Sequence, residues 1–249
     1  MSNKIRLGIL GGGGDSLIGV LHRVAANMFD QYEIVGGVFN PNFDENISFA
    51  KKIGINTSRI YKDFETLIKQ ESKLNASKRM QVVSVLTPNF LHYPMAKKLL
   101  ENNFHVICEK PLTTTYQEAL ELQKIQKEKN TVFAVTHTYT GYPMVRQMTK
   151  MISEGIIGNI QKVDGQYLQG WLNPVIHDKE KRSSTWRLDP KKSGSSCCLG
   201  DIGTHAFNMV ELVTGMKVNK LLADLNTLYD DNPMDIDANI LIRFSNNAK

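Results

Sequence analysis

Two residues near the C-terminal third of the chain have the spacing of a proton-transfer pair. Asp201 and His205 stand four residues apart in the stretch Gly-Asp-Ile-Gly-Thr-His (200–205). On a helix that begins near Ile202 they project from the same side. A histidine exchanges a proton near neutral pH and a neighbouring carboxylate stabilises its charged form, so the pair could act as a general acid or base. The same pattern also suits a helix-capping aspartate and a histidine packed against a sheet.

A lysine occupies the end of a short apolar run. Val106 to Cys108 are β-branched or small and apolar, which predicts a buried strand of a parallel sheet, and Glu109-Lys110-Pro111 follow. Pro111 restricts Lys110 to an extended conformation. Ligands of open α/β sheets bind at the carboxyl ends of the strands. Lys110 is therefore either a solvated turn residue or a charge held at a binding site.

The N-terminal segment predicts a dinucleotide-binding loop. A strand over residues 4–10 precedes four glycines (11–14), and a helix follows over 17–28. In this context glycines let the backbone approach a pyrophosphate, which lies at the helix N-terminus. The G-x-G-x-x-G spacing is not kept, because Ser16 takes the third glycine position and Gly19 comes three residues later. A flexible turn would also collect glycine.

Asn40 stands where the cofactor's ribose is usually recognised. It ends a predicted strand over residues 32–39, at the position where this kind of fold commonly places an acid. An asparagine can bond a hydroxyl but does not repel a 2′-phosphate, and no arginine follows immediately. Both NAD and NADP therefore remain open as cofactors.

The elements around these residues predict two domains. Strands alternate with helices as far as Thr136, which indicates a doubly wound parallel sheet. Beyond it, strand-like segments over 161–171, 220–229 and 237–244 accompany a helix over 201–215. Long strands with few helices indicate an α+β domain built on an open, mostly antiparallel sheet.

Composition excludes several classes of function. The 249 residues are 41% hydrophobic, enough for one large core or two modest ones. The net charge of +5 is spread without a basic block, which argues against nucleic-acid binding. No apolar run approaches the roughly 18 residues of a membrane span. A chain that passes straight into a strand, with three cysteines that lack disulfide or zinc spacing, is expected to be cytoplasmic and metal-free.

Taken together, these stretches resemble the Gfo/Idh/MocA oxidoreductase family, which includes glucose–fructose oxidoreductase and inositol dehydrogenase. The family has an N-terminal Rossmann domain that binds NAD(H) or NADP(H) and an open-faced sheet domain that holds a sugar or polyol. The resemblance extends from residue 4 to about residue 244. It rests on Glu109-Lys110-Pro111, Thr87-Pro88-Asn89 with His92, Trp186-Arg187, Ser193-Gly194, and Asp201 with His205.

The resemblance implies an NAD(P)-dependent sugar or polyol dehydrogenase or reductase. His205 would take the substrate's hydroxyl proton, Asp201 would orient the imidazole, and Lys110 would stabilise the developing charge on the oxygen. Residues 1–136 would bind the cofactor, and residues 137–249 would bind substrate and form an oligomer. The cofactor-binding candidates are Gly11, Gly13, Gly14, Asp15, Ser16, Asn40, Thr87, Pro88, Asn89, His92, Glu109 and Lys110; the substrate-binding candidates are His137, Tyr139, Trp186 and Arg187.

Other functions remain open at this point. Some enzymes that resemble this family use a bound NAD transiently to cleave glycosides, and a non-catalytic nucleotide-binding protein is a third possibility. Family members usually continue through more sheet strands than this chain, which stops at residues 245–249. An unpaired sheet edge and uncovered apolar surface predict association into a homo-oligomer through the C-terminal sheet. Substrate identity and reaction direction do not follow from these residues.

Overall fold

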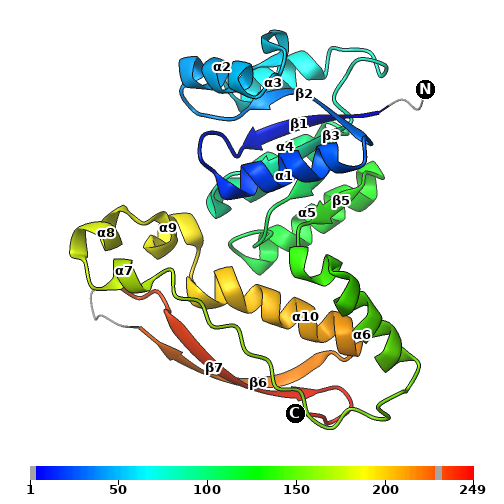
Figure 1. Cartoon of the computed structure of the whole chain (residues 1–249), viewed down its shortest axis with the longest axis vertical. Coiled ribbons are helices and arrows are strands. Elements are labelled where there is room, and N and C mark those ends of the chain that lie inside the picture. The colour runs from blue at the N-terminus through cyan, green and yellow to red at the C-terminus, as the bar shows by residue number, and fades with distance from the viewer. Residues whose placement is uncertain (1–3, 228–231) are drawn as a thin grey trace. The chain divides into compact units, whose positions relative to one another are not determined.

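The protein consists of two compact units, residues 1–136 and 137–249. The computed structural model describes residues 4–227 and 232–249 (Figure 1). The last part of the strand predicted over 220–229 lies outside these described residues. Each unit is described by itself below.

A five-stranded parallel sheet forms the centre of the first unit. The strand order is β2-β1-β3-β4-β5, so the order reverses between β1 and β3. This doubly wound parallel sheet confirms the predicted fold class. The carboxyl ends of β1, β3 and β4 therefore meet at one edge, which is where such sheets bind ligands. The strands are β1 (Ile5–Gly11), β2 (Tyr32–Val38), β3 (Val82–Leu86), β4 (His105–Cys108) and β5 (Phe133–Val135).

Helices cover both faces of this sheet. Helices α1 (Leu17–Met28) and α2 (Phe43–Lys52) pack on one face, and α3 (Phe64–Glu71), α4 (His92–Glu101) and α5 (Tyr116–Lys129) pack on the other. Burial on both sides explains why the strands are continuous apolar runs. The fully buried side chains on the second face include Leu67, Leu99, Leu100, Phe104 and Leu122.

Local signals fix where these helices begin. The Ser16 hydroxyl accepts a hydrogen bond from Gly19 N and starts α1, and the Asp63 carboxylate does the same for α3. Helix α5 begins with a capping box in which Thr115 and Glu118 satisfy each other's backbone groups. The helix begins after Thr115 because Thr115, three residues before Glu118, is the residue that completes the box.

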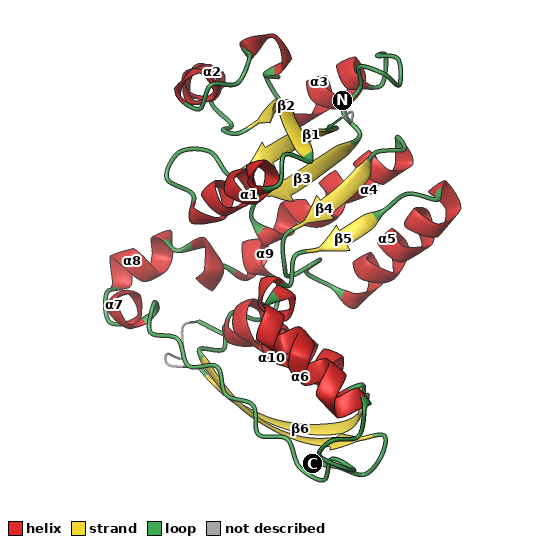
Figure 2. Cartoon of the chain, turned by 45° about the vertical axis from the view of Figure 1, so that its right-hand side comes forward, coloured by secondary structure: helices red, strands yellow, loops and turns green. Residues whose placement is uncertain are grey.

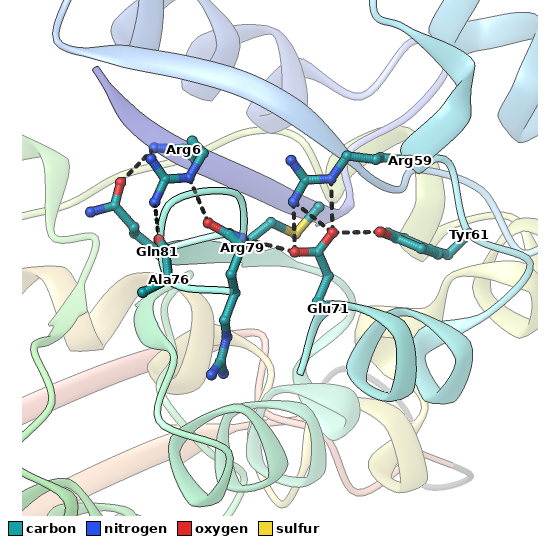
Figure 3. A network of polar contacts seen from close by, with 8 residues as sticks. Arg6, Arg59, Tyr61, Glu71, Ala76, Arg79 and Gln81 are labelled. Atoms are coloured by element: carbon teal, nitrogen blue, oxygen red, sulfur yellow. Dashed lines mark hydrogen bonds and ion pairs between the residues drawn. The ribbon is translucent and has the colours of Figure 1, made fainter. Parts of the chain in front are cut away.

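The buried carboxylate of Glu71 is the centre of a polar network beside the segment that leads into β3 (Figure 3). Glu71 has no exposed surface, and its carboxylate accepts hydrogen bonds from Arg59 Nε at 2.9 Å and from Met80 N at 2.8 Å. The Tyr61 hydroxyl also donates to it. Burial and the Glu71 carboxylate raise the pKa of Tyr61 to about 12. Beside it, Arg6 Nε donates to the Arg79 carbonyl at 2.7 Å and ties β1 to the segment before β3.

The second unit contains two long helices and a two-stranded antiparallel ribbon. Figure 2 shows α6 (Pro143–Ser153) and α10 (Thr204–Thr214) side by side over β6 (Val218–Asn226) and β7 (Asp237–Phe244). Small apolar clusters hold it together, one of them around Met216 and Phe244. Its shorter elements are η3 (Thr138–Gly141), α7 (Asn173–Ile176), α8 (Lys179–Ser184), η4 (Trp186–Leu188), α9 (Pro190–Ser193) and η5 (Leu199–Gly203).

The strand expected over 161–171 does not form. The segment is extended, but only its beginning pairs, through Val163 N to the Lys249 carbonyl at 2.7 Å and Lys249 N to the Gln161 carbonyl at 3.1 Å. Alternating side chains predict an extended backbone, whereas a strand also needs a neighbouring ladder. Beyond this pairing, the segment lines a cavity of about 830 Å³ together with residues of β6, β7 and α10. The polar loop that follows the segment contains the short helices α7 to α9.

Candidate functional site

The glycine loop between β1 and α1 is shaped by positions that only glycine occupies without strain. Gly11 and Gly12 have φ of +77° and +67°, and Gly14 has φ of +56°. A Cβ on Gly13 would lie 2.5 Å from the Phe39 carbonyl oxygen, so the loop presses against the end of β2. The backbone is therefore bare of side chains beside the N-terminus of a 12-residue helix.

Gly19 takes the packing role that the sequence assigned to position 16. A Cβ on Gly19 would lie 1.8 Å from the Gly12 carbonyl oxygen, so α1 can approach β1 only with a glycine here. Arg23 reinforces the contact by donating to the same oxygen at 2.8 Å. Ser16 caps the helix. The loop is thus a lengthened form of G-x-G-x-x-G, and its close backbone approach fits a dinucleotide pyrophosphate.

Glu109 is held in place at the end of β4. Its Oε1 lies 2.9 Å from His22 Nε2 and accepts from the Thr136 hydroxyl at 2.6 Å. Its Oε2 accepts from Lys110 N at 3.3 Å. Burial alone would raise the pKa of Glu109, but the hydrogen bonds from His22 and Thr136 outweigh it and lower that pKa below its usual value. The carboxylate is therefore charged beside the lysine, and the Lys110–Pro111 peptide is cis.

His92 joins two strand ends. Its side chain is almost fully buried, with Nε2 2.7 Å from the Thr87 carbonyl oxygen and Nδ1 2.7 Å from the Pro111 carbonyl oxygen. Burial lowers the pKa of His92. The imidazole therefore fixes the loop after β3 against the turn after β4. Of the neighbouring candidates, Asn89 is buried, while Thr87 and Pro88 are half-buried.

Asn40 lies at the end of β2, as predicted, but its side chain is engaged. Its Oδ1 accepts from Asn42 N at 2.8 Å, and its Nδ2 donates to Glu45 at 2.7 Å. Glu45 is exposed in the first turn of α2. A carboxylate therefore does lie beside the end of β2. It belongs to Glu45, five residues after Asn40, the position at which such folds commonly place an acid.

In the second unit, Asp201 and His205 lie at the start of α10. Asp201 belongs to η5, a π-helical turn, and His205 to the first turn of α10. Turns of this kind recur at functional sites. The turn is anchored by Asp235, a buried carboxylate that accepts from Cys197 N at 2.9 Å and from Leu199 N at 2.8 Å. The position of Asp201 is therefore fixed by a residue far along the chain, in the segment just before β7.

Aromatic side chains surround His205. Its ring centroid lies 4.6 Å from that of Tyr139, 5.9 Å from that of His137 and 6.1 Å from that of Tyr167. The two tyrosine hydroxyls are 2.6 Å apart. Burial and the hydrogen bond with Tyr139 raise the pKa of Tyr167 to about 12. Hydroxyl and imidazole groups at one place suit a polyhydroxylated ligand. Tyr167 was not among the predicted site residues, because it lies in the segment expected to be a strand.

Arg187 is clamped beside Asp201. Its guanidinium carbon lies 4.5 Å from the ring centroid of Trp186 and 5.3 Å from that of Trp171, and Nε is 3.4 Å from Asp201 Oδ2. Stacking on aromatic rings and pairing with a carboxylate is typical of arginine. Arg187 and Trp186 therefore help to hold the Asp201 turn.

The predicted residues gather in two groups, one in each unit. In the first unit the glycine loop, the β2 end, Thr87 to Asn89 and the Glu109–Lys110 turn share the carboxyl edge of the sheet, with Asp15 exposed in the loop. In the second, His137, Tyr139, Arg187, Asp201 and His205 share the start of α10. Over residues 4–227 and 232–249, no set of three or more His, Cys, Asp and Glu side chains could hold a metal ion.

Comparison with known proteins matches both units. Residues 5–137 match an oxidoreductase family with an NAD-binding Rossmann fold, and residues 145–249 match the GFO/IDH/MocA C-terminal domain. An inositol dehydrogenase homologue from Azotobacter vinelandii, solved with NAD+, has a TM-score of 0.91 and 33% identity over 100% of this chain and 64% of its own.

Two curated relatives are also similar. The uncharacterized oxidoreductase YfiI of Bacillus subtilis is 33% identical over 100% of this chain and 63% of its own length. A levoglucosan dehydrogenase from Pseudarthrobacter phenanthrenivorans is 35% identical over 62% of this chain and 38% of its own length. The chain thus spans less than two thirds of the relatives it matches. No helix in the described part of the chain is long and apolar enough to cross a membrane. The chain belongs to the Gfo/Idh/MocA oxidoreductase family.

Proposed function

We propose that the protein is an NAD(P)-dependent oxidoreductase that transfers a hydride between the nicotinamide and a sugar or polyol. The observation that carries this proposal is the arrangement at the start of α10. His205 lies four residues after Asp201, and its ring is surrounded by the side chains of Tyr139 and Tyr167, whose hydroxyl groups are in contact. The glycine loop, with its bare backbone at Gly12, Gly13 and Gly19, supports the cofactor half. The similar proteins include an inositol dehydrogenase homologue and a levoglucosan dehydrogenase, which supports the same chemical class here.

Three side chains carry the polar chemistry. His205 accepts the proton that the substrate hydroxyl loses, and Asp201 stabilises the resulting imidazolium. Lys110 donates to the reacting oxygen and stabilises its developing negative charge. The bound nicotinamide supplies the hydride chemistry. The remaining candidates hold the ligands: residues 11, 13–16, 40, 87–89, 92 and 109 frame the cofactor, and His137, Tyr139, Trp186 and Arg187 frame the substrate.

We further propose a preference for NAD over NADP. The Glu45 carboxylate, held by Asn40, lies at the strand end where a 2′-phosphate would be placed, and like charges repel. Glu45→Gln is expected to raise the affinity for NADP more than that for NAD. Asp44→Asn, which removes an exposed charge from the preceding residue of the same turn, is the control. Equal affinity ratios for the wild type and Glu45→Gln, measured by fluorescence titration, would refute the preference.

The C-terminal sheet is proposed as the surface for self-association. Leu222 and Leu241 face each other across β6 and β7 and are 69% and 72% exposed. Leu222→Lys is expected to shift sedimentation towards the monomer while changing the free energy of unfolding by less than about 0.5 kcal/mol. Leu120→Lys, at an exposed leucine of α5, is the control and should leave sedimentation unchanged. Identical sedimentation of both variants would remove this role from the sheet.

A titration and an activity panel test the main proposal. The full chain is titrated with NAD(H) and NADP(H), and a panel of sugars and inositols is then followed at the nicotinamide absorbance. His205→Ala and Lys110→Ala are each expected to lower kcat by about 100-fold or more while cofactor binding persists. Release of sugar without accumulation of NADH would indicate the glycosidase alternative. Binding without any turnover would indicate a non-catalytic protein, and no binding of either cofactor would overturn the whole proposal.

A further inference from the structure

His22 is a buried polar residue on a helix that the proposed mechanism does not use. It lies in the middle of α1, and its Nε2 is 2.9 Å from Glu109 Oε1. The two side chains are only 15% and 11% exposed. A histidine on the inner face of an amphipathic helix needs a partner, because an unpaired buried polar group costs about 1–3 kcal/mol. Its partner, Glu109, directly precedes Lys110 in the sequence.

Glu109 transmits this contact to the lysine. Its backbone N donates to the Val85 carbonyl at 3.0 Å, which sets the strand end against β3. Its carboxylate then takes His22 and Thr136 on one oxygen and Lys110 N on the other. The carboxylate therefore bridges α1, the end of β5 and the backbone of Lys110, so that a shift of His22 changes how the lysine is presented.

Two adjacent residues of α1, His22 and Arg23, contact two different turns at the carboxyl edge of the sheet. Arg23 donates to the Gly12 carbonyl at 2.8 Å and so fixes the glycine loop, while His22 fixes the Glu109 turn. Both contacts are made within one turn of a helix that is rigidly seated by Gly19. One turn of α1 therefore contacts both the glycine loop and the Glu109 turn.

We propose that His22 is a positioning residue that acts through Glu109 to place Lys110 and to couple it to the glycine loop. This inference rests on the proposed function, since Lys110 is there the group that stabilises the reacting oxygen. It adds a residue that touches neither cofactor nor substrate. Its substitution is expected to change kcat more than the affinity for the cofactor.

The charge state of Glu109 provides a second signature. The titratable groups that face it are His22 from α1, Cys108 from β4, His92 from α4 and Lys110 from the turn. The hydrogen bond from His22 lowers the pKa of Glu109. When His22 is removed, Glu109 should therefore take up a proton at a higher pH than in the wild type.

The test compares His22→Leu with His22→Gln, whose amide can still donate to Glu109, and with His105→Leu as the control. His105 is an exposed histidine at the start of β4, the strand that Glu109 follows. NMR follows the Glu109 carboxyl carbon and the Lys110 amide through a pH titration. We expect the Glu109 midpoint to rise in His22→Leu, to stay near the wild-type value in His22→Gln, and to be unchanged in His105→Leu. An unchanged midpoint in His22→Leu would overturn the proposal.

Kinetics supply the second arm. In His22→Leu, kcat should fall by about 10- to 100-fold with the dissociation constant for NADH within about threefold of the wild type, and His22→Gln should recover most of the loss. Equal losses in His22→Leu and His105→Leu would also overturn the proposal. If the wild type neither binds NADH nor oxidises a polyol, the proposed function fails, and the NMR arm still decides whether His22 controls Glu109 and Lys110.

Discussion

The two units bury their apolar surface to very different extents. In the first, helices cover both faces of the sheet, and Leu99, Leu100 and Phe104 have no exposed surface. In the second, helices cover one side of a two-stranded ribbon, and Leu222 and Leu241 remain largely exposed. A two-stranded ribbon is barely stable by itself. The first unit therefore completes its own core, whereas the second depends more on polar anchors and on surfaces that it offers to others.

Both units nevertheless use the same device to fix a functional turn. In the first, Glu109 receives His22, Thr136 and Lys110 N at the end of β4. In the second, Asp235 receives Cys197 N and Leu199 N before the Asp201 turn. A buried carboxylate is stable only when it is fully hydrogen-bonded. If either turn moved, its carboxylate would lose hydrogen bonds and the unit would lose stability. Each carboxylate therefore stabilises the geometry of its turn.

The largest expected effect is the loss of stability when one buried carboxylate is removed from each unit. Glu71→Ala leaves Arg59 and Tyr61 without their shared partner and should cost the first unit about 3–5 kcal/mol, whereas Asp235→Ala should cost the second about 1–3 kcal/mol. Trp171 and Trp186 both lie in the second unit, so their fluorescence reports its unfolding, and far-ultraviolet circular dichroism reports both units.

In urea, Glu71→Ala should therefore move the dichroism transition and leave the tryptophan transition in place, and Asp235→Ala should move the tryptophan transition. If each variant moved both transitions by the same amount, the two units would unfold as one, and the comparison would be wrong.

A smaller effect tests the packing of Gly19 against the backbone of the glycine loop in the first unit. Gly19→Ala places a Cβ against the Gly12 carbonyl and should cost about 1–3 kcal/mol, with at least about a tenfold loss of NADH affinity because the loop must move. Gly141→Ala, in the second unit, meets open space and should change stability by less than about 0.5 kcal/mol. Titration and urea unfolding of the two variants provide the comparison. Wild-type affinity in Gly19→Ala would show that the loop does not depend on this contact.

Elements with local signals could be predicted from the sequence, and those defined by partners could not. The helix predicted over residues 17–28 is α1 with those bounds, and β7 covers the predicted residues 237–244. The segment over 161–171 was wrongly predicted as a strand, because alternation does not reveal whether a neighbouring strand exists.

The site followed the same rule. The Asp201–His205 pair and the Glu109–Lys110 turn could be proposed from the sequence because their residues are close together in it. The packing role of Gly19 was not predicted, because the expected G-x-G-x-x-G spacing assumes a loop of fixed length. His22 was missed because its partner lies 87 residues away, and nothing on α1 distinguishes it from an ordinary core histidine.

The smallest expected effect uses the three free thiols as probes of the two units. Cys108 lies in the first unit, and Cys197 and Cys198 in the second. Burial raises the pKa of all three, that of Cys197 to about 12, so the reactive thiolate is scarce at pH 8 and alkylation should accelerate as the pH rises.

The half-buried Cys198 should react first with iodoacetamide. Cys197 and Cys108 can react only after local opening, and the unit with the smaller core should open at a lower free energy. Mass spectrometry of the labelled peptides should therefore find Cys197 modified before Cys108 at every urea concentration below the first transition. The opposite order would mean that Asp235 and the contacts around it hold the second unit more tightly than its exposed leucines suggest.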